Sequence, residues 1–183
     1  MVIRMRLLLL ALLSLTAPLA SASDLATELA AKAGIAFAQY KMGDYHYAGE
    51  EGYPQDHEKA AYWYLKSAKG GNAKGQLAIG IAYRRGQGVP SDMEAALYWM
   101  KKSASNGHSL AMYNLGLFYL NKADQPPVGD YYTEAYAWFI ITRDDGGSQS
   151  HSASSELSSL DRRMTRDDTA FARGRARTLK ASL

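Results

Sequence analysis

The stretch IGIAYRRGQGVPSDMEAALYWMKKSASNG, residues 79–107, is the most complete copy of a unit that recurs in this chain of 183 residues. The chain has three tryptophans, and each ends an Ala-x-x-Trp segment: Ala60 to Trp63, Ala96 to Trp99, and Ala135 to Trp138. The tryptophans therefore lie 36 and 39 residues apart. A recurring spacing of this length indicates a repeat array, in which stacked units share one continuous core.

Each unit has two halves joined by a turn. The copy at 79–107 runs through Ile79-Gly80-x-x-Tyr83, Gly86-x-Gly88-Val89, Asp92, Ala96-x-x-Trp99 and Asn106-Gly107. The third copy runs through Leu115-Gly116-x-x-Tyr119, Ala135-x-x-Trp138 and Gly146-Gly147, with three extra residues around Pro126-Pro127-Val128-Gly129. In the first copy Met42-Gly43 is followed by Tyr47 one residue late, and the later landmarks are Gly52-Tyr53, Asp56 and Gly70-Gly71.

Each half is predicted to be an α-helix. In residues 92–105 the apolar side chains recur at intervals of three and four, which places them on one stripe: Ala95, Ala96, Trp99 and Met100. Ser91 and Glu94 are expected to form a capping box at the start of this helix, and Gly107 to end it in the left-handed conformation. Gly80 and Gly116 lie inside helices, where glycine costs ~1 kcal/mol relative to alanine, so we expect a neighbouring helix to approach closely there.

The tryptophans are expected to join successive units. Burying one indole removes up to ~200 Å² from water, which is worth ~5 kcal/mol as an upper bound. An alanine three residues earlier lies on the same helix face, as expected of a helix contact. The alternative is that exposed tryptophans form an aromatic platform for a sugar or a cation.

The succession of Leu-Gly-x-x-Tyr, Gly-x-Gly-Val, Asp, Ala-x-x-Trp and a closing glycine resembles the Sel1-like repeat. That resemblance implies an all-α fold, an α/α solenoid of helix-turn-helix repeats related to tetratricopeptide repeats. It covers about residues 33–148, divided into repeats at 33–72, 73–108 and 109–148. The first repeat lacks the first glycine of the turn motif, having Glu50 before Glu51-Gly52-Tyr53, and the third has Pro126-Pro127 instead. We expect the turns of these two repeats to differ from that of the second.

The two ends of the chain have other roles. Residues 1–22 are predicted to be an export signal, with Arg4 and Arg6, an apolar stretch at 7–15 and Ala20-Ser21-Ala22 as the cleavage site. The mature repeat array would then occupy residues 23–148. An uncleaved anchor is the alternative, although the apolar run ends at Pro18, short of the ~20 residues that a spanning helix needs. Residues 149–183 are predicted to form a pair of helices that caps the array. The first helix is indicated by Leu157, Leu160 and Met164. The second begins at a capping signal formed by Thr165 and Asp168 and includes Ala170, Phe171, Gly174 and Leu179. A loose linker at 148–159 is the alternative to the first of these helices.

Composition narrows the function classes. The chain has no cysteine, which excludes disulfides, thiolate metal sites and lipid attachment through a processed cysteine. The formal charge of +3 falls to +1 without Arg4 and Arg6, with 19 basic against 18 acidic residues. Residues 161–183 carry seven basic and three acidic side chains, while residues 23–160 carry 12 basic and 15 acidic ones. We interpret the basic tail as a solvated helix face and expect no nucleic-acid partner for an exported protein.

Motifs for chemistry are weak. Gly86-Gln87-Gly88 is interpreted as a turn, because the third glycine and the preceding strand of a dinucleotide loop are missing. Metal ligands are most concentrated in the first repeat, at Asp44, His46, Glu50, Glu51, Asp56 and His57, where a solvated loop is the favoured interpretation. The acid pairs Asp144-Asp145 and Asp167-Asp168 are adjacent and therefore diverge on a helix, unlike the facing acids of a glycosidase. We therefore assign no catalytic, metal or cofactor-binding residue.

Binding is the stronger hypothesis. The resemblance to tetratricopeptide solenoids implies that the first helix of each pair lines a concave surface. The side chains carried over to that surface are Lys74, Leu77, Ile81, Arg84, Arg85, Leu110, Tyr113, Leu117, Leu120 and Asn121. Apolar groups beside three cations would suit a peptide with hydrophobic anchors and an acidic residue or a free carboxylate. The alternative is that these positions are packing and ordinary surface.

Three functions are compatible with the sequence. The first is a non-enzymatic adaptor or scaffold in a bacterial cell envelope, exported to the periplasm, that holds an extended segment of another protein. The second is a regulator or assembly factor for envelope polysaccharide or peptidoglycan, in which a glycan meets the tyrosine-rich surface. The third is an enzyme of unknown type, which would need two convergent polar groups in a concave pocket. No residue decides the oligomeric state.

Overall fold

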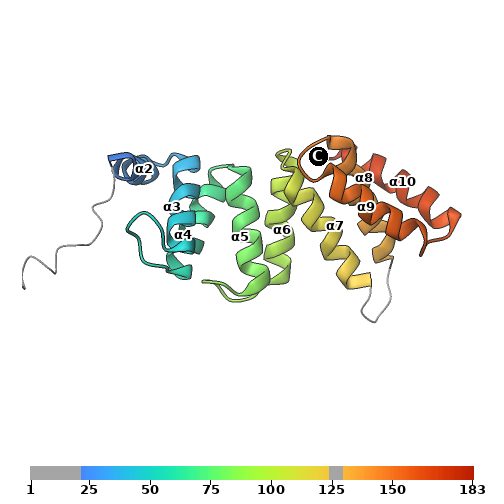
Figure 1. Ribbon diagram of the computed structural model, residues 1–183, viewed down its shortest axis with the longest axis horizontal. Coiled ribbons are helices and arrows are strands. Elements are labelled where there is room, and N and C mark those ends of the chain that lie inside the picture. The colour runs from blue at the N-terminus through green and yellow to red at the C-terminus, as the bar shows by residue number, and fades with distance from the viewer. Residues whose placement is uncertain (1–21, 124–129) are drawn as a thin grey trace, which may run out of the picture.

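The computed structural model describes residues 22–123 and 130–183, and these residues form helices and no strand. Nine helices follow one another along the described chain: α2 (Ala22–Lys32), α3 (Ala36–Ala48), α4 (His57–Lys69), α5 (Ala73–Arg85), α6 (Met93–Ser105), α7 (Ser109–Ala123), α8 (Tyr131–Asp145), α9 (Ser150–Asp161) and α10 (Arg166–Ala181). They succeed one another along the long axis of the molecule, with α2 at one end and α9 and α10 at the other (Figure 1). The predicted all-α solenoid with a C-terminal helix pair is confirmed.

The glycines inside the first helices allow the hairpins to close. A Cβ at Gly43 of α3 would lie 2.4 Å from the Tyr64 ring of α4, and one at Gly116 of α7 would lie 2.5 Å from the Phe139 ring of α8. At Gly80 of α5 it would lie 3.0 Å from Cγ of Met100 in α6. The close approach expected at Gly80 and Gly116 is confirmed, and each glycine faces the same position of its partner helix.

The three indoles pack in comparable ways. Trp63 belongs to a cluster that contains Ala31 of the preceding helix α2, and Trp99 to a cluster that contains Ala60 and Ala61 of the preceding repeat. Trp138 belongs to the largest cluster, with Leu77 and Met100 of the second repeat, and is only 2% exposed. Trp63 and Trp99 are half-buried. Each tryptophan therefore packs back onto the helices that precede its own hairpin.

The start of α6 differs from the prediction. Ser91 does not cap this helix; instead Oδ1 of Asp92 accepts hydrogen bonds from the backbone amides of Glu94 and Ala95, at 2.9 and 3.0 Å. A carboxylate is a good acceptor at this end of the helix because it also meets the positive end of the helix dipole. The other signals are confirmed: Gly107 has a φ of 73°, and Thr165 and Asp168 form a capping box at the start of α10.

The turn of the first repeat was aligned wrongly from sequence. Gly49 ends α3 with a φ of 75° and donates its amide to the Tyr45 carbonyl, as Gly86 ends α5 with a φ of 65° and donates to Ala82. The first turn glycine is therefore present, and the extra residue lies after it. Glu51, with a φ of 52°, occupies the place that Gly88, with a φ of 73°, has in the second repeat.

Gly88→Ala is expected to lower the free energy of unfolding by at least about 2 kcal/mol, because a left-handed alanine costs ~1 kcal/mol or more and overpacking adds to it. The added Cβ would lie 1.9 Å from the carbonyl oxygen of His57 at the start of α4, and backbone cannot move aside as a side chain can. The measurement is a urea melt followed by circular dichroism. Glu51→Gly is the matched control at the equivalent position, and it should change the free energy of unfolding by less than about 1 kcal/mol. Glycine relieves the strain of the left-handed backbone, but it also raises the conformational entropy of the unfolded chain, so the two effects partly cancel.

Helix α2 is held to the first repeat by two tyrosines. The Tyr53 hydroxyl donates to Oε2 of Glu28 at 2.9 Å, and the Tyr45 hydroxyl donates to Oδ1 of Asp24 at 3.3 Å. The predicted export signal lies outside the described residues except for Ala22, the first residue of α2, and the Pro126-Pro127 insertion lies outside them too. None of the helices at 22–123 and 130–181 combines the length and the apolar character that a membrane span requires.

Attachment of α2 should depend on pH. Hydrogen bonds from Lys32 and then Tyr53 lower the pKa of Glu28. The stabilisation that ionised Glu28 gives to the attachment of α2 is therefore fully present at a pH above the ordinary pKa of glutamate. It is lost as the pH falls through the lowered pKa. Burial raises the pKa of Tyr53 to about 12, so this contact persists as the pH rises past the ordinary tyrosine value and is lost only beyond it. Backbone chemical shifts of residues 22–32 should stay helical at neutral pH and lose that character on acidification. Tyr53→Phe should show part of this loss already at pH 7, because Asp24 and the buried Ala31 still hold α2. Chemical shifts of wild-type α2 that do not change between pH 7 and pH 3 would contradict the prediction.

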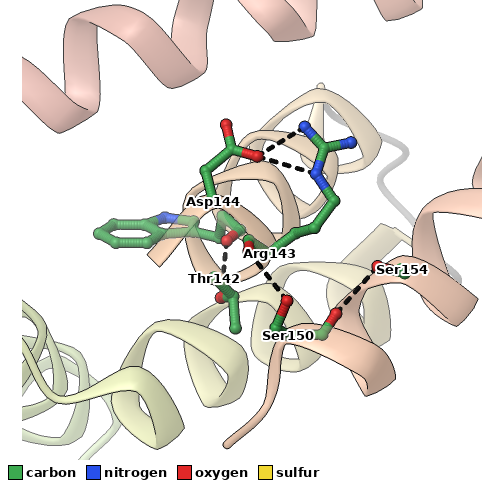
Figure 2. Close-up of polar contacts among 6 residues, drawn as sticks. Thr142, Arg143, Asp144, Ser150 and Ser154 are labelled. Atoms are coloured by element: carbon green, nitrogen blue, oxygen red, sulfur yellow. Dashed lines mark hydrogen bonds and ion pairs between the residues drawn. The ribbon is translucent and has the colours of Figure 1, made fainter. Parts of the chain in front are cut away.

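The serine-rich segment after the last repeat is helical, so the alternative of a loose linker is wrong. Ser150 and Ser154 lie in α9, where each hydroxyl donates to a carbonyl oxygen, Ser150 to Arg143 and Ser154 to Ser150, both at 2.9 Å (Figure 2). Leu157 and Leu160 of α9 are buried. Helix α10 packs on α8 through Ala172 and Ala176, while Phe171 is 64% exposed. Small side chains therefore form the inner face of the last helix.

Candidate binding groove

Helices α5 and α7 carry all ten residues predicted for the concave face, and nine of the ten line three hollows. The apolar pocket, of about 260 Å³, lies between α3, α4 and α5; the arginine groove, of about 770 Å³, lies between α5, α6 and α7; and a third hollow of about 310 Å³ lies beside Tyr40, Lys74 and Leu110. Ile81 and Arg85 line the apolar pocket, and Arg84, Arg85, Leu117, Leu120 and Asn121 line the arginine groove. The third hollow contains Lys74, Leu77, Ile81 and Leu110.

Two predicted residues serve mainly in packing. Tyr113 lines none of the three hollows; its ring packs against Phe139, with centroids 5.6 Å apart, and its hydroxyl donates to Glu156 of α9 at 3.4 Å. Leu77 is 5% exposed and belongs to the core cluster of Trp138. At these two positions the side chain faces a neighbouring helix more than it faces the groove.

The apolar pocket has a floor of small side chains. Four alanines line it, from α4 and α5: Ala60, Ala61, Ala78 and Ala82. On its wall the Tyr64 hydroxyl donates to Oδ1 of Asp44 at 2.9 Å. Burial, followed by the charge of Asp44, raises the pKa of Tyr64 well above the usual tyrosine range, so the hydroxyl stays a donor. Arg85 also lines this pocket.

The arginine groove is cationic and has no acidic residue in its lining. Arg84, Arg85 and Lys122 line it together with apolar side chains such as Leu117 and Leu120. Arg84 is half-buried, and its Nε has no hydrogen-bond partner among the described residues. Burial, followed by the charge of Arg85, lowers the pKa of Arg84. The guanidinium groups of Arg84 and Arg85 therefore line the same groove, and no acidic residue of the described chain forms an ion pair with either of them.

Sequence reasoning missed several lining residues. Among the alanines of the apolar pocket only Ala60 was interpreted, as a helix contact, and no role was predicted for Ala61, Ala78, Ala82, Tyr64, Met93 or Lys122. A signal for Tyr64 was present, because the positions equivalent to it in the other repeats are Met100 and Phe139, which carry no hydroxyl. A hydroxyl at this packing position in only one of the three repeats indicates that the pocket of that repeat has a role other than helix packing.

Residues 22–123 and 130–183 contain no group of three or more histidines, aspartates or glutamates placed to hold a metal ion. In the first repeat, His46 instead packs its ring against Tyr53, with centroids 5.1 Å apart. Gly86-Gln87-Gly88 is a turn, as predicted, with left-handed glycines at both ends.

The Sel1 repeat family matches this chain at residues 36–72, 73–108 and 109–143, which together make up more than half of it. A Sel1 repeat protein from Oxalobacter formigenes superposes with a TM-score of 0.58 at 24% identity, over 74% of this chain and 96% of that one. The protective antigen c5321 of uropathogenic Escherichia coli, which displays the same repeat fold, superposes with a TM-score of 0.59 at 21% identity, over 84% of this chain and 39% of that one.

One similar segment occurs in a much longer protein. The ERAD-associated E3 ubiquitin-protein ligase component HRD3A of Arabidopsis thaliana is 39% identical over 59 residues, which is 32% of this chain and 9% of that protein. Sel1 repeat proteins generally mediate protein–protein interactions, and their fold is typically a non-catalytic adaptor. The three matched repeats, with the helical hairpins that they form, show that this chain belongs to the Sel1 repeat family.

Proposed function

We propose that this protein is a non-enzymatic adaptor of the bacterial cell envelope that binds an extended segment of another protein in the hollows between α3, α5 and α7. The observation that carries the proposal is Arg84, a half-buried guanidinium whose Nε has no partner among the described residues and whose neighbour in sequence is a second arginine. Taking a charge out of water is costly unless a partner compensates for it. A carboxylate of the bound segment supplies that partner, and arginine binds carboxylates with two parallel hydrogen bonds.

The apolar pocket supplies the second half of the recognition. Its volume of about 260 Å³ exceeds the ~150 Å³ of a cavity that holds benzene, so a leucine, methionine or phenylalanine side chain fits. Because Arg85 lines both the pocket and the arginine groove, the apolar side chain and the acidic group would be close neighbours in the bound segment. From there the segment continues over Leu117 and Leu120 of α7.

The proposed location rests on the amino-terminal residues. Arg4 and Arg6, the apolar stretch at 7–15 and Ala20-Ser21-Ala22 match the composition of a cleaved export signal. Cell fractionation with mass spectrometry of the amino terminus tests this part: a periplasmic protein that begins near Ser23 supports it, and a cytoplasmic protein that keeps residues 1–22 contradicts it.

A glycan ligand is the second candidate, and it would use another surface. Tyr62 of α4 and Tyr98 of α6 are 54% and 53% exposed, and each ring stands nearly perpendicular to the tryptophan that follows it. Exposed aromatic rings are suited to stacking against sugars. Capture from an envelope extract by the immobilised protein separates the two functions: peptide binding predicts bound protein that soluble glycan does not displace, and displacement by glycan would favour the second candidate.

A further inference from the structure

A hollow of about 410 Å³ lies between α8 and α10, and none of its lining residues lines the binding groove. Its floor is apolar, with Ile140 and Ile141 of α8 and Ala176 of α10. Its edges carry four cations and one acid: Arg143, Arg173, Arg177, Lys180 and Asp144. An apolar floor between charged edges distinguishes this hollow from an ordinary basic surface, which is solvated throughout.

Three of the four cations lack a counter-ion in the described chain. Asp144 is already paired, because its Oδ1 lies 2.8 Å from Nε and 2.7 Å from a terminal nitrogen of Arg143 (Figure 2). Of the other two acids of α8, Glu134 is paired with Arg175 at 2.6 Å, and Asp145 lines a neighbouring hollow together with Lys180. Among residues 22–123 and 130–183, no acid forms an ion pair with Arg173, Arg177 or Lys180. The lining of the hollow, with four cations and one acid, therefore carries an excess of positive charge.

The cations form a row. Arg173, Arg177 and Lys180 are four and three residues apart, so they lie on one face of α10 and line the same side of the hollow. At 1.5 Å per residue, Arg173 and Arg177 are offset by about 6 Å along the helix axis. In an extended peptide, residues two apart point to the same side and are about 6.6 Å apart. Acidic residues at alternate positions of an extended segment therefore match the row.

We propose that the hollow between α8 and α10 is a second binding site, which holds an extended acidic peptide segment with acidic residues at alternate positions and an apolar residue between them. The acidic side chains point toward α10 and pair with Arg173, Arg177 and Lys180. The apolar side chain between them points to the opposite side of the extended segment and packs on Ile140 and Ile141 of α8. A lone phosphate ion would satisfy the cations but leave the apolar floor uncovered. The site does not share a residue with the binding groove, so it stands whether or not the groove binds a peptide.

The test uses the full mature chain and a synthetic peptide of alternating glutamate and leucine, followed by NMR of the protein's backbone amides. The expected result is a saturable change centred on residues 140–144 and 173–180. Arg177→Glu with Lys180→Glu should weaken binding at least ten-fold. Arg162→Glu with Arg166→Glu changes the charge of the same tail equally and lies outside the hollow, so it should weaken binding by less than about two-fold. Thermal midpoints of both variants show that each is folded.

Three outcomes would overturn the proposal. An equal loss in both double variants would mean general attraction to a basic tail. A peptide with serine in place of leucine that binds as tightly would mean that the floor plays no part. Changes at residues 140–144 and 173–180 caused by inorganic phosphate or by vesicles of anionic lipid, and not by the peptide, would assign the hollow to a different ligand.

Discussion

Replacing Trp138 by alanine is expected to lower the free energy of unfolding by about 3–5 kcal/mol, the range for deleting a large buried aromatic side chain. The indole is 2% exposed and lies in a cluster that joins the second repeat to the third: Leu77, Met100, Ala104, Leu115 and Ile141. Ala176 of α10 belongs to the same cluster. Removing this ring leaves a cavity where two repeats and the last helix meet, so no single hairpin can close it by moving.

Urea melts of the variant, followed by circular dichroism and fluorescence, measure this change. Trp63→Ala is the matched control, since Trp63 has the same place in its repeat but is only half-buried, and we expect a smaller loss there. Trp138→Phe should cost less than Trp138→Ala, because phenylalanine keeps most of the ring and removes an Nε1 that has no hydrogen-bond partner among the described residues. A loss below about 1 kcal/mol for Trp138→Ala would contradict the proposed packing role.

The double variant Arg84→Glu, Arg85→Glu is expected to bind its partner at least about 30-fold more weakly, which corresponds to the ~2 kcal/mol or more that losing one partner of a desolvated ion pair costs. Its thermal midpoint should stay nearly unchanged, because neither arginine forms an ion pair with the described residues. Two carboxylates in the arginine groove would repel the acidic group that two guanidinium groups attract.

The control for this variant is Lys101→Glu with Lys102→Glu. Both lysines are exposed on α6, and the pair changes the net charge by the same amount outside the three hollows. Binding that survives in the arginine variant, or that falls equally in the lysine variant, would remove Arg84 and Arg85 from the site. A large drop in the thermal midpoint would instead assign the arginines to the stability of the fold.

Most of the architecture was predictable because it depends on spacing. The tryptophans, the alanines before them and the helix glycines recur at intervals that only stacked hairpins satisfy, and the Gly80 and Gly116 contacts followed from the cost of glycine in a helix. Local details were less predictable. Ser91 and Asp92 are both good cap residues, and only the position of the first helical turn shows which side chain reaches the free amides.

The sequence predicted which helices carry the candidate site, but it did not predict how far each side chain is exposed. The resemblance to tetratricopeptide solenoids assigned ten residues of the first helices to the groove, and nine of them line hollows. The position of a residue in its repeat does not show how far a neighbouring helix covers its side chain. The packing of Leu77 in the core and of Tyr113 against Phe139 was therefore not predicted. The apolar pocket depends on four small side chains from the consecutive helices α4 and α5, and such a gap appears only when the helices are placed together.

Site-specific photo-crosslinking tests most directly which face of the molecule holds the partner. A photoreactive phenylalanine analogue at Leu117, in the arginine groove, is compared with the same analogue at Tyr98, which is exposed on α6. Binding between α3, α5 and α7 predicts that a partner protein in an envelope extract is crosslinked from position 117 and not from position 98. Crosslinking from position 98 alone would contradict the proposed groove and place the partner on the tyrosine-bearing surface.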